Sequence, residues 1–218
     1  SKVLDITAPL YPPSGAYLLD KSRYRNHGTI VGATWVRQAS GLWVLSWDNV
    51  DDYVEIAHHA SLLLTTGGTL LAWIYPLSAG ENGVGRIFDK SDATIGTNGY
   101  LFRVIAGTVT GRTSFVIYSG NIHSTDNSIV WNAWQLVGVT FTALGGVSHY
   151  VNGVAQGTGT TLAASNITST VVMRLGQKAT DISMTFNGKM WGHRIFNTQL
   201  TAAQHAALFA QERGLLGV

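Results

Sequence analysis

The sequence predicts an all-β protein, an antiparallel β-sandwich of the jelly-roll type that ends in a short helix. Three observations predict this fold class. Apolar and polar residues alternate with a period of two along most of the chain, in runs rich in β-branched and aromatic residues. Glycine, asparagine, aspartate and serine separate these runs, and the chain has 25 glycines in 218 residues. Helical spacing begins late, at Thr201.

From the N-terminus, residues 1–14 are predicted to form an extended arm, either an edge strand or a surface strap. The arm contains Pro9, Pro12 and Pro13, and proline cannot donate a ladder hydrogen bond. Residues 15–218 are predicted to form one domain. Its predicted strands are residues 53–56, 70–75, 100–105, 114–118, 135–141, 148–151, 171–175 and 189–196. Asn152-Gly153 predicts a type I′ hairpin turn, which requires two positive φ angles.

The C-terminal helix is predicted from its capping signals. Thr201 and Gln204 have the spacing of a capping box, and residues 202–212 are good helix formers. Gly214 is placed to end the helix. Leu200 and Leu208 belong to a short apolar stripe, which we expect to lie on a sheet edge or across one end of the sandwich.

The composition excludes several classes of protein. Cysteine is absent, which excludes disulfides, thiolate zinc sites and thiol catalysis. The net charge is +2, and the densest basic group, Lys21, Arg23 and Arg25, is interpreted as a solvated loop, so no nucleic-acid partner is expected. No apolar run approaches the ~20 residues of a membrane span.

Six segments carry a resemblance to a known fold. Residues 20–29 look like the pattern D-x-S-x-x-x-N-x-G-T, and residues 45–56 look like L-x-F-D-G-x-D-D-Y-V-x-I. Residues 69–76, 134–141, 150–153 and 186–197 look like later strands of the same pattern, in the same order. Together they cover about 80% of the chain if the whole span from residue 20 to residue 196 is counted. The chain therefore resembles the laminin-G-like, concanavalin A-like jelly rolls.

This resemblance implies the fold but leaves the function open, because the fold hosts sugar-binding modules, adhesion domains, glucanases and virion parts. It implies an extracellular, cell-surface or virion-associated protein. It also implies that Trp47, Trp73, Trp134 and Tyr150 pack in the core.

The sequence does not predict an enzyme. The glucanases of this fold place three carboxylates on one strand with the pattern E-x-D-x-x-E, whereas the glutamates here are Glu55, Glu81 and Glu212, none five residues apart. Asp51 and Glu55 share a strand face, but loop hydrogen bonding by Asp51 and Asp52 is the simpler interpretation.

The resemblance implies a structural calcium at Asp20, Asn26 and Gly28. Calcium takes six to eight oxygen ligands, and the acidic pair that completes the site in relatives is replaced here by Trp191-Gly192. Arg23 and Arg25 also add positive charge to this loop. An Asx turn at Asp20 is therefore the favoured interpretation of this loop.

For a sugar, the sequence favours the loop that contains Trp131. Aromatic faces pack against sugar C–H groups, while amides and carboxylates bind the hydroxyls. The predicted site is Trp131, Asn121, Asp126, Tyr118 and His123. A second candidate face carries Trp191, Arg103 and Tyr100.

The predicted function is non-catalytic recognition of a glycan or surface polysaccharide, as in a lectin. The alternative is a structural decoration or adhesion subunit of a virion or extracellular assembly, acting through contacts with a partner protein or a second copy of the chain. The low content of charged residues, 12%, and the N-terminal arm favour this alternative.

Overall fold

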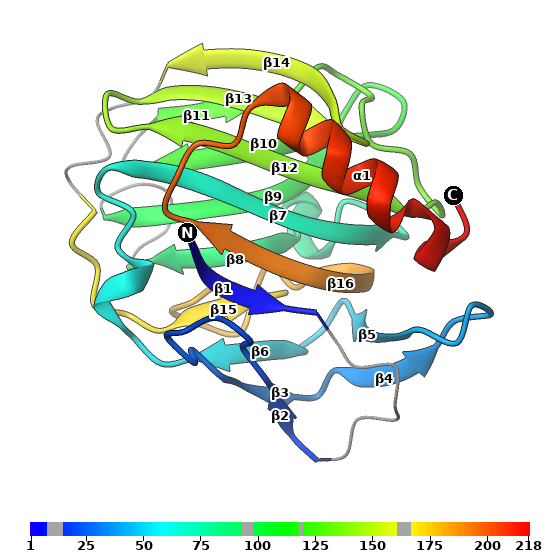
Figure 1. The fold of residues 1–218 in the computed structure, drawn as a ribbon. Coiled ribbons are helices and arrows are strands. Elements are labelled where there is room, and N and C mark those ends of the chain that lie inside the picture. Colours follow the sequence, from blue (N-terminus) through cyan, green and yellow to red (C-terminus); the bar gives the residue numbers. More distant parts are fainter. Residues whose placement is uncertain (8–14, 93–97, 118–119, 161–166) are drawn as a thin grey trace.

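Two antiparallel sheets of eight strands each face one another in the computed structural model (Figure 1). The structure describes residues 1–7, 15–92, 98–117, 120–160 and 167–218. A helix, α1 (Ala202–Leu216), lies outside one of the sheets. The predicted all-β sandwich with a C-terminal helix is therefore confirmed. Short 3-10 turns lie at Ala60–Leu62 and Glu81–Gly83.

The first sheet is built around β16, the strand that closes the family pattern. Its strands in spatial order are β14 (Val154–Thr160), β13 (Gly146–Val151), β12 (Gln135–Thr142), β7 (Gly67–Pro76), β16 (Asn187–Phe196), β5 (Trp43–Asp48) and β4 (Thr34–Arg37). β7 pairs with one edge of β16. The other edge is shared, because β5 pairs with residues 187–190 and β1 (Lys2–Ile6) pairs with residues 193–196.

The second sheet runs across the sandwich from β11 to β2. Its strands in spatial order are β11 (Gly120–His123), β10 (Gly111–Ile117), β9 (Gly99–Ala106), β8 (Arg86–Ser91), β15 (Met173–Leu175), β6 (Tyr53–Ile56), β3 (Gly28–Val31) and β2 (Tyr17–Leu18). The inner core between the sheets is apolar, with Phe88, Phe102 and Phe115 in register on three adjacent strands.

One strand in each sheet corrects or completes the sequence expectations. β1 is an edge strand whose Val3, Leu4 and Ile6 are buried, so the beginning of the predicted arm belongs to the sheet of its own chain. The rest of that arm, with its three prolines, lies outside the described residues. β8 escaped prediction because its residues are all buried, charged ones included, and show no alternation.

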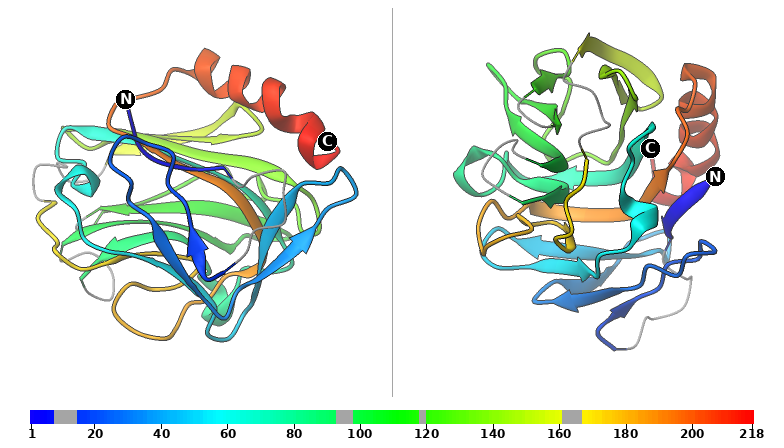
Figure 2. Two further views of the ribbon diagram at one scale, coloured as in Figure 1. Left: turned by 60° about the horizontal axis from the view of Figure 1, so that its bottom comes forward. Right: turned by 90° about the vertical axis from the view of Figure 1, so that its left-hand side faces the viewer.

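A second apolar core lies on the outer face of the first sheet, beneath α1. It contains Trp73, Leu136 and Trp191, and Leu208 and Phe209 of the helix pack against it. The ring of Phe209 stacks on Trp73 at 5.7 Å between centroids. The helix therefore covers a sheet face (Figure 2, right), not the sheet edge or sandwich end that the sequence predicts.

The predicted turn chemistry is largely confirmed. Asn152 and Gly153 have φ angles of 52° and 78°, as the type I′ hairpin requires. The capping box of Thr201 and Gln204 is present. The helix runs past Gly214, however, and ends at Gly217, whose φ is 75°, because Leu216 is buried against the outer core.

The helix is anchored by buried polar contacts as well. Arg194 donates to both carboxylate oxygens of Glu212, at 2.5 and 2.7 Å, and the indole nitrogen of Trp73 donates to the same carboxylate at 2.8 Å. Arg194 is only 2% exposed. The carboxylate of Glu212 thus neutralises a guanidinium that the sheet buries.

We expect Glu212→Ala to destabilise the protein by about 3 kcal/mol, because it leaves the buried guanidinium of Arg194 and the indole N–H of Trp73 without an acceptor. Urea unfolding measures the change. Gln211→Ala, on the exposed side of the same helix turn, is the control and should change the free energy of unfolding by less than about 0.5 kcal/mol. Equal effects of the two substitutions would contradict an anchoring role for the ion pair.

Candidate functional site

Trp131 packs against the sheet in the structure. Its six-membered ring lies directly over Gly111 of β10, where any β-carbon would collide with it. The ring also contacts the inner core, and the side chain is half-buried. Gly111 therefore makes room for Trp131, which acts in part as a packing residue.

Asp126 supports a turn. Its carboxylate accepts hydrogen bonds from the backbone N–H and the hydroxyl of Thr108, in the turn between β9 and β10. The neighbouring Asn127 accepts from the N–H groups of Val109 and Thr110. The Thr108 hydroxyl lowers the pKa of Asp126 below its usual value. The carboxylate is engaged in holding this hairpin together.

Asn121 and His123 lie on β11 and join a different group of side chains. The register places Ser114 opposite His123 and Arg103 opposite Ser114. Ser114 Oγ donates to Asn121 Oδ1 at 2.7 Å and accepts from Arg103 Nε at 3.1 Å. These side chains belong to the polar face of the second sheet.

The structure thus brings Asn121 and His123 together and does not bring Trp131 to the same side of β10. Gly111, beneath Trp131, and Ser114 are an odd number of residues apart on one strand, so they face opposite sides of the sheet. Tyr118, the fifth predicted residue, lies outside the described residues. The sequence missed Arg103 as a neighbour of Asn121, since that contact depends on the register of β9, β10 and β11.

The second predicted face is divided in the structure. Tyr100 points into the core and donates to the carbonyl of Leu62. Arg103 lies on the outer side of the second sheet, and Trp191 lies in the outer core of the first sheet. The prediction that these three residues share a face is wrong, because Tyr100 and Arg103 point to opposite sides of one strand.

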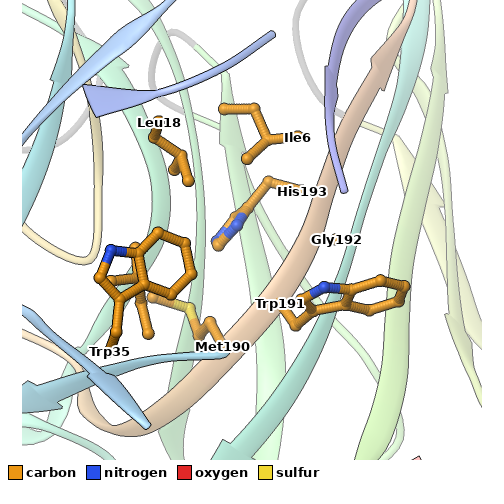
Figure 3. Close-up of a pocket in the computed structure, with 8 residues that line it drawn as sticks. Ile6, Leu18, Trp35, Met190, Trp191, Gly192 and His193 are labelled. Carbon is orange, nitrogen blue, oxygen red and sulfur yellow. The ribbon is translucent and has the colours of Figure 1, made fainter. Parts of the chain in front are cut away.

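A bulge in β16 separates Trp191 from His193, and Figure 3 shows their rings on either side of the strand. Gly192, between them, has a φ of 67°. The cavity beside His193 is about 10 Å³ and is lined mainly by apolar side chains, including Ile6, Leu18 and Met190. It has room for one water at most, so it is no ligand site.

The Asp20 loop is held by the chain itself. Asp20 Oδ1 accepts from the backbone N–H groups of Asp5 and Ser22, and Oδ2 accepts from the Ser22 hydroxyl and the Asn26 N–H, at 2.7–2.8 Å. The bond to the N–H of Ser22 is an Asx turn. The Asn26 amide nitrogen donates to the carbonyl of Val3. As folded, the loop does not fit a calcium ion without breaking these bonds.

Carboxylates do gather at another hairpin of the described chain. Oxygens of Asp48, Asp51 and Asp52 lie within 4.8 Å of one another at the turn between β5 and β6. Burial raises the pKa of Asp52 to about 6, although Asp52 also accepts the N–H of Asp48 at 2.8 Å. That bond agrees with the loop role expected for Asp52.

An open hollow with aromatic walls lies beside the C-terminal end of α1. Its volume is about 260 Å³, and it is lined by Gln38, Ala39, Ser40, Tyr75, Trp134, Lys189, Leu216 and Gly217. The rings of Tyr75 and Trp134 are 5.6 Å apart and inclined at 58°. We call this feature the aromatic hollow.

Five separate segments build the aromatic hollow: β7, β16, the turn between β4 and β5, the residue before β12, and the end of α1. The pairing of β7 with β16 places Lys189 beside Tyr75, with its ammonium 5.1 Å from the centre of the tyrosine ring. The turn between β4 and β5 supplies Gln38, which accepts from the indole nitrogen of Trp134 at 3.3 Å. Ser40 ties that turn to the helix by donating to the carbonyl of Leu215 at 2.6 Å.

Comparison with known proteins agrees with this architecture. A model of the concanavalin A-like lectin/glucanases superfamily, of the Laminin_G_3 type, matches residues 48–204. No curated protein matches the chain by sequence. A similar solved structure is domain 4 of the extracellular arabinanase AbnA from Geobacillus stearothermophilus, in complex with arabinotriose. It has a TM-score of 0.68 and 15% identity, over 95% of this chain and 98% of that one.

Two toxin structures are also similar. The binding domain of Paraclostridial Mosquitocidal Protein 1 gives a TM-score of 0.71 at 12% identity, over 96% of this chain and 52% of that one. Botulinum neurotoxin type C, whose cell entry depends on two ganglioside molecules, gives a TM-score of 0.68 at 14% identity, over 97% of this chain and 51% of that one. The chain thus spans about half the length of these toxin chains. At such identities the likeness shows the fold alone. None of the described helices is long and apolar enough to cross a membrane.

The buried His193 should make the protein sensitive to mild acid. Burial, with the charge of Arg194, lowers its pKa to about 3, whereas an unfolded histidine titrates near 6.5. Between these values the unfolded state binds the extra proton, so stability falls as the pH falls, by up to about 1.4 kcal/mol per pH unit. We expect His193→Phe to remove this slope, since His193 Nε2 is buried without a hydrogen-bond partner.

The measurement is urea unfolding of both proteins between pH 7.5 and 4.5. The variant should retain a weaker dependence of stability on pH, because burial also lowers the pKa values of His149 and His205 to about 4. The raised pKa of Asp52 gives a dependence of the opposite sign in both proteins. Parallel pH curves for the variant and the wild type would show that His193 is not responsible.

Proposed function

The chain belongs to the concanavalin A-like lectin/glucanases superfamily, and on this premise we propose that it is a non-catalytic, glycan-binding recognition module. The observation that carries the proposal is the inclined pair of Tyr75 and Trp134 in the open aromatic hollow. Ligand pockets usually have volumes of ~300–1,000 Å³, so a hollow of about 260 Å³ suits a small unit such as one sugar ring.

The mechanism follows from the chemistry of the walls. The rings of Tyr75 and Trp134 supply the apolar surface against which the C–H groups of a sugar ring would pack. The amide nitrogen of Gln38 and the ammonium of Lys189 are donors to its hydroxyl oxygens. None of the eight lining residues is a carboxylate, and a glycosidase needs two carboxyl groups at the bond to be cleaved. The hollow is therefore suited to binding a sugar rather than hydrolysing it.

Shallow sites of this kind bind weakly one at a time. Repeated copies on a surface would raise the overall avidity, because the second contact becomes intramolecular. The arabinotriose complex of the similar arabinanase domain supports a saccharide as the first ligand to test. Asn121 and His123, on the second sheet, stay a proposed alternative surface for the same class of ligand.

We expect Tyr75→Ala to weaken glycan binding at least tenfold, a loss of about 1.4 kcal/mol, because it removes the stacking face and leaves the sheet pairing intact. A glycan array identifies the oligosaccharide retained by the wild type, and calorimetry with that oligosaccharide gives the affinities. Arabinotriose is titrated in the same series.

Tyr17→Ala is the matched control, since Tyr17 is 68% exposed on β2 in the second sheet. Loss of affinity with Asn121→Ala but not with Tyr75→Ala would move the glycan to the second sheet and overturn the aromatic hollow as its site. A wild-type protein that retains no glycan would overturn the function itself.

Assembly through protein contacts is the second candidate function. An open groove between β16 and α1, of about 270 Å³, exposes apolar parts of Phe196, Leu200 and Leu208. If this surface serves assembly, light scattering of the purified chain should give the mass of a dimer or larger oligomer over a range of concentrations. A monomer at every concentration tested would exclude self-assembly.

A further inference from the structure

A row of polar side chains crosses four strands on the outer side of the second sheet. The register places Arg86 of β8 beside Arg103 of β9, Arg103 beside Ser114 of β10, and Ser114 beside His123 of β11. We call these four residues the cationic row. Figure 1 shows β8 to β11 side by side in this sheet. The row lies on the opposite face of the sandwich from the aromatic hollow.

The first member, Arg86, is neutralised within the chain. Its Nε donates to Asp89 Oδ2 at 2.8 Å, and both side chains are buried, at 1% and 0% exposure. Its other nitrogens donate to the carbonyl of Val84 and to the sulfur of Met184. The second oxygen of Asp89 accepts from Ser91. Both oxygens of Asp89 therefore accept hydrogen bonds from other residues, and neither accepts one from Arg103.

Arg103 is not neutralised in the same way. It is 5% exposed, and its Nε donates to Ser114 Oγ at 3.1 Å. Within the described residues, neither of its two terminal nitrogens has a hydrogen-bond acceptor, and no carboxylate pairs with it. A buried guanidinium that no carboxylate contacts is costly. Burial and the positive charge of Arg86 lower the pKa of Arg103 to about 10, and the nearby charge of Asp89 offsets only part of this effect, so Arg103 stays charged at neutral pH.

The neighbours of Arg103 add donors and no acid. Arg112, two residues before Ser114 on the same strand face, has its Nε buried without a partner. Nδ1 of His123 is also buried without a partner. Burial lowers the pKa of His123, and the positive charges of Arg112 and Arg103 lower it further. On the described strands β8 to β10, the guanidinium groups of Arg86, Arg103 and Arg112 share the outer face with the carboxylate of Asp89, which is paired with Arg86. Glu55, farther across the same sheet, is paired with Arg174.

We infer that Arg103 is the anchor of a second binding site, on the outer face of the second sheet, for a ligand that carries a carboxylate. A carboxylate supplies the missing negative charge, and its two oxygens match the parallel N–H groups at the free end of a guanidinium. Asn121, whose Oδ1 is held by Ser114, has an amide nitrogen that can donate to the rest of the ligand. The inference does not depend on the aromatic hollow or on its ligand.

The test is calorimetric titration of the whole chain with four probes: glucuronate, acetate, glucose and sulfate. Glucuronate or acetate should bind and glucose should not. A clear preference for glucuronate over acetate would identify an acidic sugar as the ligand, and equal binding would identify a small organic acid. Binding of sulfate without binding of either carboxylate would overturn the proposal, as would the absence of all binding.

Arg103→Lys keeps the positive charge but removes the two parallel N–H groups of the guanidinium, so it should weaken carboxylate binding at least tenfold. Arg37→Gln, on an exposed position of β4 in the other sheet, is the control and should bind as the wild type does. If Arg103→Lys binds equally well, Arg103 is not the anchor.

A second variant tests the charge balance without any ligand. Arg103→Gln removes the uncompensated charge, so in buffer free of carboxylates its urea midpoint should equal or exceed that of the wild type. Added glucuronate or acetate should raise the midpoint of the wild type and leave that of the variant unchanged. A variant with a much lower midpoint in the ligand-free buffer would show that the guanidinium is already compensated, against the proposal.

Discussion

The ion pair between Arg194 and Glu212 is the interaction on which the outer half of the molecule depends. Of the residues of α1, His205 and Leu216 are fully buried, so apolar burial contributes only part of the stability of the helix on the sheet. The carboxylate of Glu212 adds to this stability, because it neutralises a guanidinium in the central strand β16 and accepts a hydrogen bond from Trp73. Once the helix is placed, Leu216 closes one wall of the aromatic hollow. An ion pair one helical turn before Leu216 thus sets the shape of the hollow.

The sequence predicts the fold well because the fold rests on local signals. Alternation identified several strands of the inner core, though not β8, Asn152-Gly153 identified a hairpin, and Thr201 with Gln204 identified the start of the helix. The order of the six family segments identified the family, and the family model, which matches residues 48–204, confirms it. The signals failed where tertiary contacts decide. Gly214 did not end the helix, because burial of Leu216 favours one more turn.

The binding surfaces were harder to predict because they are formed by pairs of residues distant in sequence. Trp131 was expected to contact a sugar, but Gly111 in another segment makes room for its ring, and only the fold brings the two together. Tyr75 and Lys189 are neighbours through strand pairing, and Arg103 meets Ser114 and Asn121 in the same way. A shift of one residue in either register would point these side chains to the other face. Composition and spacing contain no information on that register.

The scarcity of charge in this chain has a different meaning in the structure than in the sequence. With 12% charged residues, the sequence suggested a neutral surface suited to protein contacts. Several of those charges are inside, including Arg86, Asp89, Lys90 and Arg194. Most are paired or hydrogen-bonded: Lys90, for example, donates to the carbonyl of Val171 at 2.8 Å. Arg103 differs because only its Nε has a hydrogen-bond acceptor among the described residues. In a chain that uses charge so sparingly, a buried guanidinium whose two N–H₂ groups donate to none of the described residues is better explained by a ligand than by packing, since a methionine or leucine would fill the same space without the cost of burying a charge.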